Sequence, residues 1–167
     1  MELADKIAAE LILEVRRRVL VESTPRIKKC LDRLSEDQIW WRPNAESNSI
    51  GNLVLHLSGN VRQWIISGVG RKPDTRTREE EFDAQGPMPK EELWSILATT
   101  MADIESVLDS VTAEQLVTRQ PVQVYTESVL SMLVHVTEHF SYHTGQIAWI
   151  TKMITERQLG FYEGVEL

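Results

Sequence analysis

Apolar side chains recur every three or four residues along most of the chain, which is the spacing of amphipathic α-helices. The first such segment spans residues 4–34, and its apolar stripe contains Ile7, Leu11, Val15 and Val19. Pro25 should kink or interrupt this helix, because proline has no N–H group to donate to the preceding turn. A second helix is expected from residue 49 to the glycines at 68 and 70, since glycine suits the residue that follows a helix.

Two further helices are expected at residues 89–110 and 126–155, and no segment shows the sustained alternation of a strand. Residues 70–87 lack periodicity and are rich in charge, proline and glycine, so they form one long connection between the second and third helices. Four long amphipathic helices without strands predict an all-α fold, a four-helix bundle, built as a single domain over residues 1–167.

The charge balance excludes some classes of partner. Eighteen basic against twenty-five acidic residues give the 167-residue chain a net charge of −7, and no basic patch of the kind that binds nucleic acid or anionic membranes is evident. No apolar run approaches the ~18 residues of a membrane span, and the first residues show no apolar signal segment. The single cysteine, Cys30, excludes an internal disulfide. We therefore expect a cytoplasmic protein that acts on a small molecule, without nucleic-acid or membrane partners.

Three of the four histidines, His135, His139 and His143, follow one another at four-residue spacing within the fourth predicted helix. Residues four apart on a helix lie one turn above each other on the same face, so two such imidazoles can bind one divalent metal ion. The remaining histidine, His56, lies in the second predicted helix. A catalytic zinc site usually has three protein ligands and one open position, and a distant histidine plus one such pair supplies three.

Helical angles rank these histidines by expected burial. At 100° per residue, His143 lies ~40° from the centre of the apolar face of its helix, His139 ~80° and His135 ~120°. His143 should therefore be buried, His139 should line the edge of the core, and His135 should lie outermost. His56 lies ~120° from its own apolar stripe, among polar residues, on a flank that is either solvated surface or the wall of a polar cleft.

The same residues have simpler explanations. A lone histidine on an apolar helix face is more often a hydrogen-bonded core residue than a metal ligand. Two at four-residue spacing bring the metal-binding interpretation level with that explanation, because neutral imidazole is a leading metal ligand. The acidic run at residues 79–81 is most simply a solvated loop.

Several segments resemble a known superfamily. Residues 138–147, EHFSYHTGQI, look like the signature of the DinB/YfiT-like metalloenzymes, and residues 49–60, SIGNLVLHLSGN, resemble the second-helix segment of the same superfamily. Residues 40–44, WWRPN, and 78–82, REEEF, are similar to a subgroup known as a domain of unknown function. The resemblance covers nearly the whole chain.

This resemblance implies a four-helix bundle that holds zinc, nickel or iron through three histidines. Matching motif to motif places the ligands at His56, His139 and His143, and leaves His135 outside the triad. It also implies a homodimer, and some relatives transfer or isomerise substrates with a low-molecular-weight thiol, mycothiol or bacillithiol. The side chains available to orient the ligand imidazoles from behind are those of His135, Glu138 and Gln146.

Two functions remain open at this point. The first is a metal-dependent enzyme, namely a thiol-dependent S-transferase or a related transferase or hydrolase. In such an enzyme a metal-bound thiolate or water attacks a small electrophilic substrate. Alternatively, the chain is a non-catalytic metal-binding protein, a dimeric scaffold or a stress-response module. An accessible cavity beside an open metal position favours the enzyme. A sealed site with a fourth protein ligand, for which His135 is the candidate, favours the scaffold.

Overall fold

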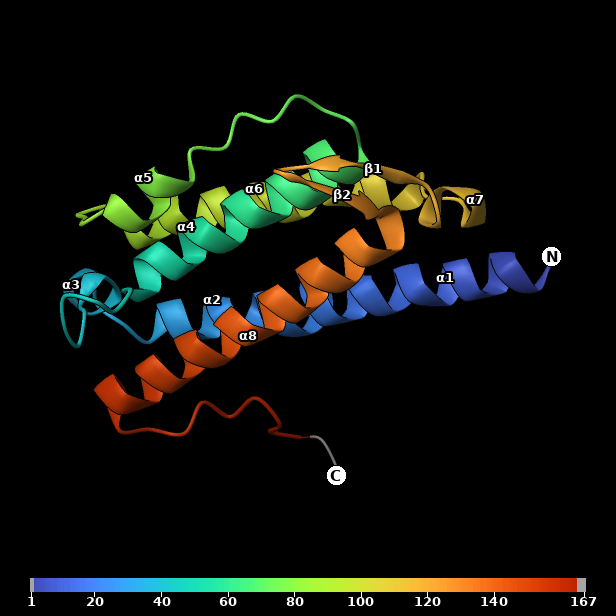
Figure 1. Cartoon of the computed structure of the whole chain (residues 1–167). Helices are drawn as coiled ribbons and strands as arrows, with labels where there is room; N and C mark the ends of the chain where they lie inside the picture. The colour runs from blue at the N-terminus through green and yellow to red at the C-terminus, as the bar shows by residue number, and fades with distance from the viewer. Residues whose placement is uncertain (1, 165–167) are drawn as a thin grey trace.

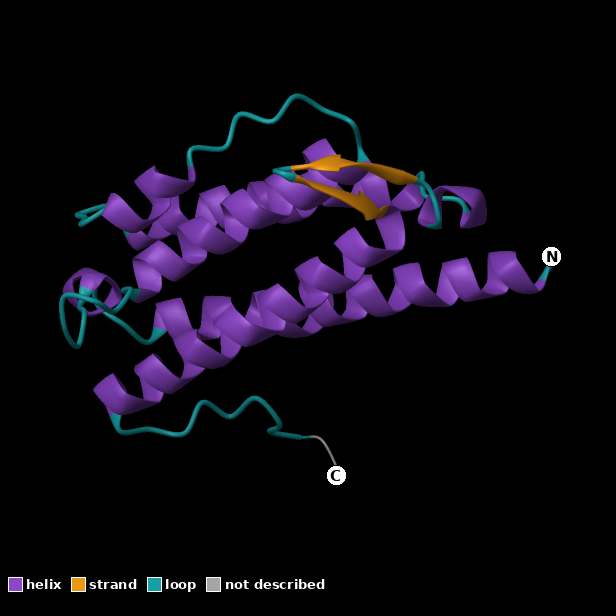
Figure 2. Ribbon diagram, viewed as in Figure 1, coloured by secondary structure: helices purple, strands orange, loops and turns teal. Residues whose placement is uncertain are grey.

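Helices form most of the chain in the computed structural model, which describes residues 2–164 (Figures 1 and 2). The long helical segments are α1 (Leu3–Arg16), the π-helical η1 (Arg17–Ser23), α2 (Thr24–Asp32), α4 (Ile50–Val61), the π-helical η2 (Arg62–Val69), α6 (Lys90–Asp109) and α8 (Val129–Thr155). The short ones are α3 (Glu36–Trp40), α5 (Arg78–Asp83) and α7 (Ala113–Leu116). None of the helices so described has both the length and the apolar character of a membrane span. The ends of the predicted domain, residues 1 and 165–167, lie outside the described residues.

The first predicted helix is one rod made of α1, η1 and α2, with no residue between them that leaves the helical path. Pro25 lies in the first turn of α2, where the geometry changes from π- to α-helical. The hydroxyl of Thr24 donates to the carbonyl oxygen of Val19 at 2.7 Å, just before the proline. The interruption expected at Pro25 is therefore a change of helical geometry and not a gap.

The last long helix, α8, packs against η1 and α2 and also against α4 and η2, while α6 packs along α4 and η2 (Figure 1). The buried apolar side chains of α8 include Leu133, Val136, Phe140 and Ile147, which form a stripe at helical spacing. Burial of each such side chain contributes about 1.5–3 kcal/mol. This stripe therefore fixes the rotation of α8 and places its histidines beside α4.

An antiparallel hairpin of two strands, β1 (Arg119–Val122) and β2 (Tyr125–Ser128), contradicts the expectation of an all-helical chain (Figure 2). Each strand has only four residues, too short a run for period-two alternation to stand out. The hairpin also takes the residues at which the fourth helix was expected to begin. Instead α8 begins after Ser128, whose hydroxyl accepts a hydrogen bond from the backbone N–H of Ser131 at 3.1 Å.

The long connection that precedes α6 folds back onto α4 and contains α5, so the expectation of an aperiodic segment was wrong in this part. A six-residue helix is too short to be stable alone. The buried amide of Asn52 donates to the carbonyl oxygens of Glu81 at 2.9 Å and Ala84 at 2.8 Å. Arg42 donates to the carbonyl oxygens of Phe82 and Ala84 at 3.0 and 3.1 Å. These bonds fix α5 beside α4.

Candidate metal centre

Three histidine side chains from two helices meet between α4 and α8. His56 lies on α4, and His139 and His143 lie one turn apart on α8. Each offers one ring nitrogen, and these three atoms all lie within 4.8 Å of one another. The Nε2 atoms of His56 and His139 are 2.9 Å apart. The fold thus brings together the three histidines that the sequence motifs singled out.

His56 lies in a polar cleft and not on a solvated surface. Only 5 % of the residue is exposed, and its neighbours Asn52 and Asn60 are buried as well. The ring of Phe82, from α5, packs on the ring of His56 with centroids 4.7 Å apart. Of the two expectations for His56, the wall of a polar cleft is the correct one, because α5 covers a flank that helical periodicity alone leaves open.

A buried ion pair orients the His56 ring. Oε2 of Glu81 lies 2.9 Å from Nδ1 of His56, and Arg76 donates from Nε to Oε1 at 2.7 Å and from Nη2 to Oε2 at 2.8 Å. Nη2 also lies 3.1 Å from Nδ1. A carboxylate only accepts, so the shorter contact of Nδ1, with Glu81, assigns the proton to Nδ1, while Nη2 of Arg76 donates to the same carboxylate. Nε2 of His56 is left with a lone pair that faces His139.

The carboxylate of Glu81 is buried, with 8 % of the residue exposed, so the expectation of a solvated run at residues 79–81 was wrong for this residue. Burial raises the pKa of Glu81, but the hydrogen bonds from Arg76 and His56 outweigh it and hold the pKa below its usual range. The group is therefore ionised at neutral pH. Gly59 makes room for it, because a Cβ atom there would lie 1.9 Å from Oε1 of Glu81.

His143 is oriented by a neighbour on its own helix. Its Nδ1 lies 2.6 Å from Oε1 of Gln146, an oxygen that can only accept. Nδ1 therefore carries the proton, and the lone pair is on Nε2. Gln146 thus occupies the position expected of a residue that orients a ligand imidazole.

The electrostatics of the cluster keep its imidazoles neutral. Burial, together with the proximity of His143 and His56, lowers the pKa of His139 to about 3. Burial also lowers the pKa of His143, and the hydrogen bond to Gln146 opposes this only in part. At neutral pH both rings consequently offer lone pairs, the form in which imidazole binds metals.

Two other residues named from the sequence lie outside the cluster. His135 is half-buried and stacks on Trp64, with ring centroids 3.9 Å apart, while its Nε2 lies 3.4 Å from Nδ2 of Asn60. Its ring is 5.4 Å from that of His139 and does not join the group of three. Glu138 is exposed and, among the described residues, makes no hydrogen bond to any of the histidines.

The donor set fits a divalent transition metal. Three imidazoles that direct nitrogens to one region are a common set of zinc ligands, and they also suit nickel and iron. The outer nitrogens of His56 and His143 are both hydrogen-bonded, as metal-binding histidines usually are. Within residues 2–164 no further histidine, cysteine or carboxylate joins the group. An ion held there would keep an open coordination position.

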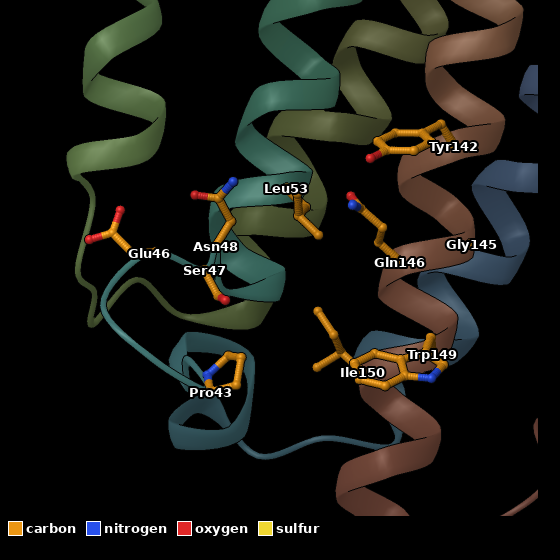
Figure 3. A pocket seen from close by; sticks show the side chains of 10 residues that line it. All are labelled: Pro43, Glu46, Ser47, Asn48, Leu53, Tyr142, Gly145, Gln146, Trp149 and Ile150. Carbon is orange, nitrogen blue, oxygen red and sulfur yellow. The ribbon is translucent and has the colours of Figure 1, made fainter.

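Two pockets lie near the cluster. The first, here called the histidine pocket, has a volume of about 390 Å³ and is lined by His56, His135 and His139. Its other walls come from η2, the segment that leads into α5, and the hairpin. The second, of about 550 Å³, lies between residues 43–48 and α8 (Figure 3). None of the three clustered histidines lines the second pocket, which reaches the cluster through Gln146 and Tyr142, both of them neighbours of His143. The histidine pocket is therefore the one of the two that clustered histidines line directly.

Sequence reasoning missed both Glu81 and Arg76. They lie in the connection without periodicity, and 25 residues separate Glu81 from His56. The usable signal was Gly59, because an isolated glycine inside a helix costs about 1 kcal/mol relative to alanine and often marks a close approach of another group.

Comparisons with known proteins identify the family of this chain. The family model described as "Protein of unknown function (DUF1572)" matches residues 6–162. A DinB-like protein from Bacillus cereus ATCC 10987 has 17 % identity and a TM-score of 0.65, over 80 % of this chain and 87 % of its own. A conserved protein from Enterococcus faecalis has 16 % identity and a TM-score of 0.67, over 94 % and 99 %. No curated protein matches.

At such identities the two solved structures are evidence for the fold alone, which is similar to that of a DinB-like protein. The family match is evidence for family membership as well, because it spans the histidine motifs, α5 and nearly all of the described residues. This chain belongs to the DUF1572 family.

Proposed function

We propose that this protein is a divalent-metal-dependent enzyme whose ion is held by His56, His139 and His143. Its reaction is the transfer of a low-molecular-weight thiol to a small electrophilic substrate, or the hydrolysis of such a substrate. The observation that carries the proposal is the meeting of three imidazole nitrogens within 4.8 Å beside an open pocket. Zinc, nickel or iron bound there would supply Lewis-acid activation of a thiol or a water.

The chain's own residues support this chemistry in distinct ways. Glu81 and Gln146 hold the protons of His56 and His143 on the outer nitrogens, which keeps the inner lone pairs available. The low pKa of His139 keeps that ring neutral well below pH 7. The histidine pocket, which His135 and Glu127 also line without joining the group of three, admits a small molecule beside His56 and His139.

These features favour the enzyme over a non-catalytic metal-binding scaffold. A structural zinc site is normally closed by a fourth protein ligand. Here His135, the residue best placed in sequence to be that ligand, stacks on Trp64 and stays outside the group. A non-catalytic metal site also does not require a cavity beside the ion.

The first test is metal analysis of protein purified without an affinity tag. One equivalent of zinc, nickel or iron per chain is expected, and it should be lost in His143→Ala. A wild type that binds no divalent ion after equilibration with each of the three would overturn the proposal.

The second test is turnover. The metal-loaded protein is offered bacillithiol, glutathione or no thiol, together with a chloro-aromatic acceptor. In thiol transfer a sulfur–carbon bond forms, chloride leaves, and the thiol proton passes to solvent. Activity should vanish with chelator and return when metal is restored. Equal rates for the wild type and His143→Ala under all conditions would exclude both transfer and hydrolysis of this acceptor.

We also propose that the long helical segments form a single-domain four-helix bundle that assembles as a homodimer through α8. Large apolar side chains on α8 are exposed at helical spacing, namely Leu130 at 41 %, Val134 at 49 %, Tyr142 at 62 % and Trp149 at 63 %. An exposed apolar stripe of this kind is typical of protein interfaces. Light scattering should give twice the 19.1 kDa chain mass, and a monomer mass at micromolar concentration would exclude the dimer.

A further inference from the structure

The histidine pocket contains an arginine that forms no ion pair within the part of the chain that the structure describes. Arg78, the first residue of α5, lines the pocket together with His56 and His139. Among residues 2–164, no carboxylate oxygen lies within 4.0 Å of its guanidinium nitrogens. Arg76, by contrast, is bound by Glu81 through two nitrogens. Arg78 is therefore the arginine of this pocket that is available to a ligand.

Aromatic stacking holds Arg78 close to the metal-binding cluster. Its guanidinium carbon lies 4.7 Å from the centroid of the Phe82 ring, a distance typical of a cation–π contact. The same Phe82 ring also packs on the ring of His56, at a centroid distance of 4.7 Å. Two ring contacts in series thus separate the guanidinium from a candidate metal ligand.

The charges around the pocket favour an anionic occupant. Arg76 is paired with Glu81, and Glu127, the one carboxylate that lines the pocket among the described residues, balances the charge of Arg78 in number but forms no ion pair with it. The two positive charges of a bound divalent ion then remain, in a chain whose net charge is −7. Such a local reversal of sign concentrates small anions at the pocket and repels cations.

We infer that the substrate is a small molecule with a carboxylate or phosphate at one end, which binds Arg78, and its reacting group at the other end, at the metal. This inference rests on the proposed function and adds the substrate class. Arg78 acts in recognition: its five N–H donors match the two oxygens of a carboxylate or phosphate. Phe82 fixes the distance between the two ends of the site.

The test uses a probe with two ends and the zinc-loaded full-length protein. Succinic acid monohydroxamate carries a hydroxamate, which coordinates divalent ions, and a free carboxylate. Its primary amide keeps the hydroxamate and removes the charge. Calorimetry should show that the wild type binds the carboxylate form about tenfold more tightly, as expected for one charge-assisted contact. Zinc content, measured on the same samples, reports separately on the proposed function.

Three variants complete the design. Arg78→Gln should bind the two probes equally, Arg78→Lys should keep most of the preference, and Arg157→Gln, which alters an exposed arginine outside the pocket, should match the wild type. Equal affinities in the wild type, or a preference that survives Arg78→Gln, would overturn the inference while the metal site stands. A wild type without bound zinc would overturn the proposed function itself. Retained zinc in Arg78→Gln shows that the cluster is intact.

Discussion

Glu81 accepts a hydrogen bond from Nδ1 of His56 at 2.9 Å, and the carboxylate is itself held by Arg76 at 2.7 and 2.8 Å. All three side chains are buried or nearly so, with the side chain of Arg76 only 4 % exposed. An ionised carboxylate behind an imidazole fixes the tautomer and makes the inner nitrogen a stronger ligand. The connection that carries Glu81 is therefore part of the candidate site.

Replacing Glu81 with glutamine should weaken zinc binding by about 10- to 100-fold, because the neutral amide no longer favours the proton on Nδ1 of His56. The matched control is Glu79→Gln, which changes an exposed residue of the same helix. Competition against a chromophoric chelator measures both affinities. Equal affinities for the two variants would show that Glu81 does not act on the ion.

Gly59→Ala should disturb the same contact from the opposite side. The added Cβ would lie 1.9 Å from Oε1 of Glu81 and 3.0 Å from Nε of Arg76, so the ion pair has to move. Overpacking of this kind costs about 1–3 kcal/mol of stability, and zinc affinity should fall with it. The control is Gly145→Ala in α8, where no atom lies within 4 Å of the new Cβ. That change should be neutral or stabilise by up to about 1 kcal/mol. Because the substitution adds the same helix propensity at both sites, urea unfolding that gives Gly59→Ala the stability of Gly145→Ala would disprove the close approach.

The long helices and the burial of His143 could be predicted because both follow from local periodicity. The apolar stripe of α8 fixes its rotation, and that rotation places His143, at 9 % exposure, deeper than the half-buried His139 and His135. The position of His56 in the cluster came from motif resemblance and not from periodicity, which points it away from the apolar stripe of its own helix.

The hairpin and the role of Glu81 could not be predicted in the same way, because both depend on contacts between distant residues. The strands β1 and β2 are too short for a pattern, and they are defined by pairing with each other. Glu81 is one of three consecutive glutamates, and only the docking of α5 on Asn52 and Arg42 selects which of them is buried.

The variant series His135→Ala, His139→Ala and His143→Ala should separate ligands from neighbours. Loss of either His139 or His143 should abolish stoichiometric zinc binding, since two imidazoles hold the ion far less tightly than three. His135→Ala should retain most of the zinc, because His135 stacks on Trp64 and lies outside the group. Metal analysis after dialysis checks all three. Loss of zinc from His135→Ala equal to that from His139→Ala would mean that the ligand set is wrongly assigned.

Acid should destabilise the metal-free protein in a way that depends on His139. In the unfolded chain this histidine takes up a proton near its ordinary pKa of ~6.5, whereas in the folded protein burial and the neighbouring histidines lower the pKa to about 3. Between these values the unfolded chain binds more protons, so stability falls as the pH decreases through this window. One such proton costs about 1.4 kcal/mol per pH unit.

Chemical unfolding of chelator-treated protein between pH 7.5 and 5 measures this dependence directly. The free energy of unfolding should decrease below about pH 6.5, and His139→Asn should reduce the slope by up to one proton, because asparagine does not titrate. Glu81 takes up a proton only at lower pH, because its pKa lies below the usual range. It is also present in both proteins, so it does not contribute to the difference between them. The difference between the two slopes therefore isolates His139. Identical slopes would show that His139 is not buried as a neutral base. They would also mean that protons compete with a metal ion for the lone pair of His139 at about pH 6.5.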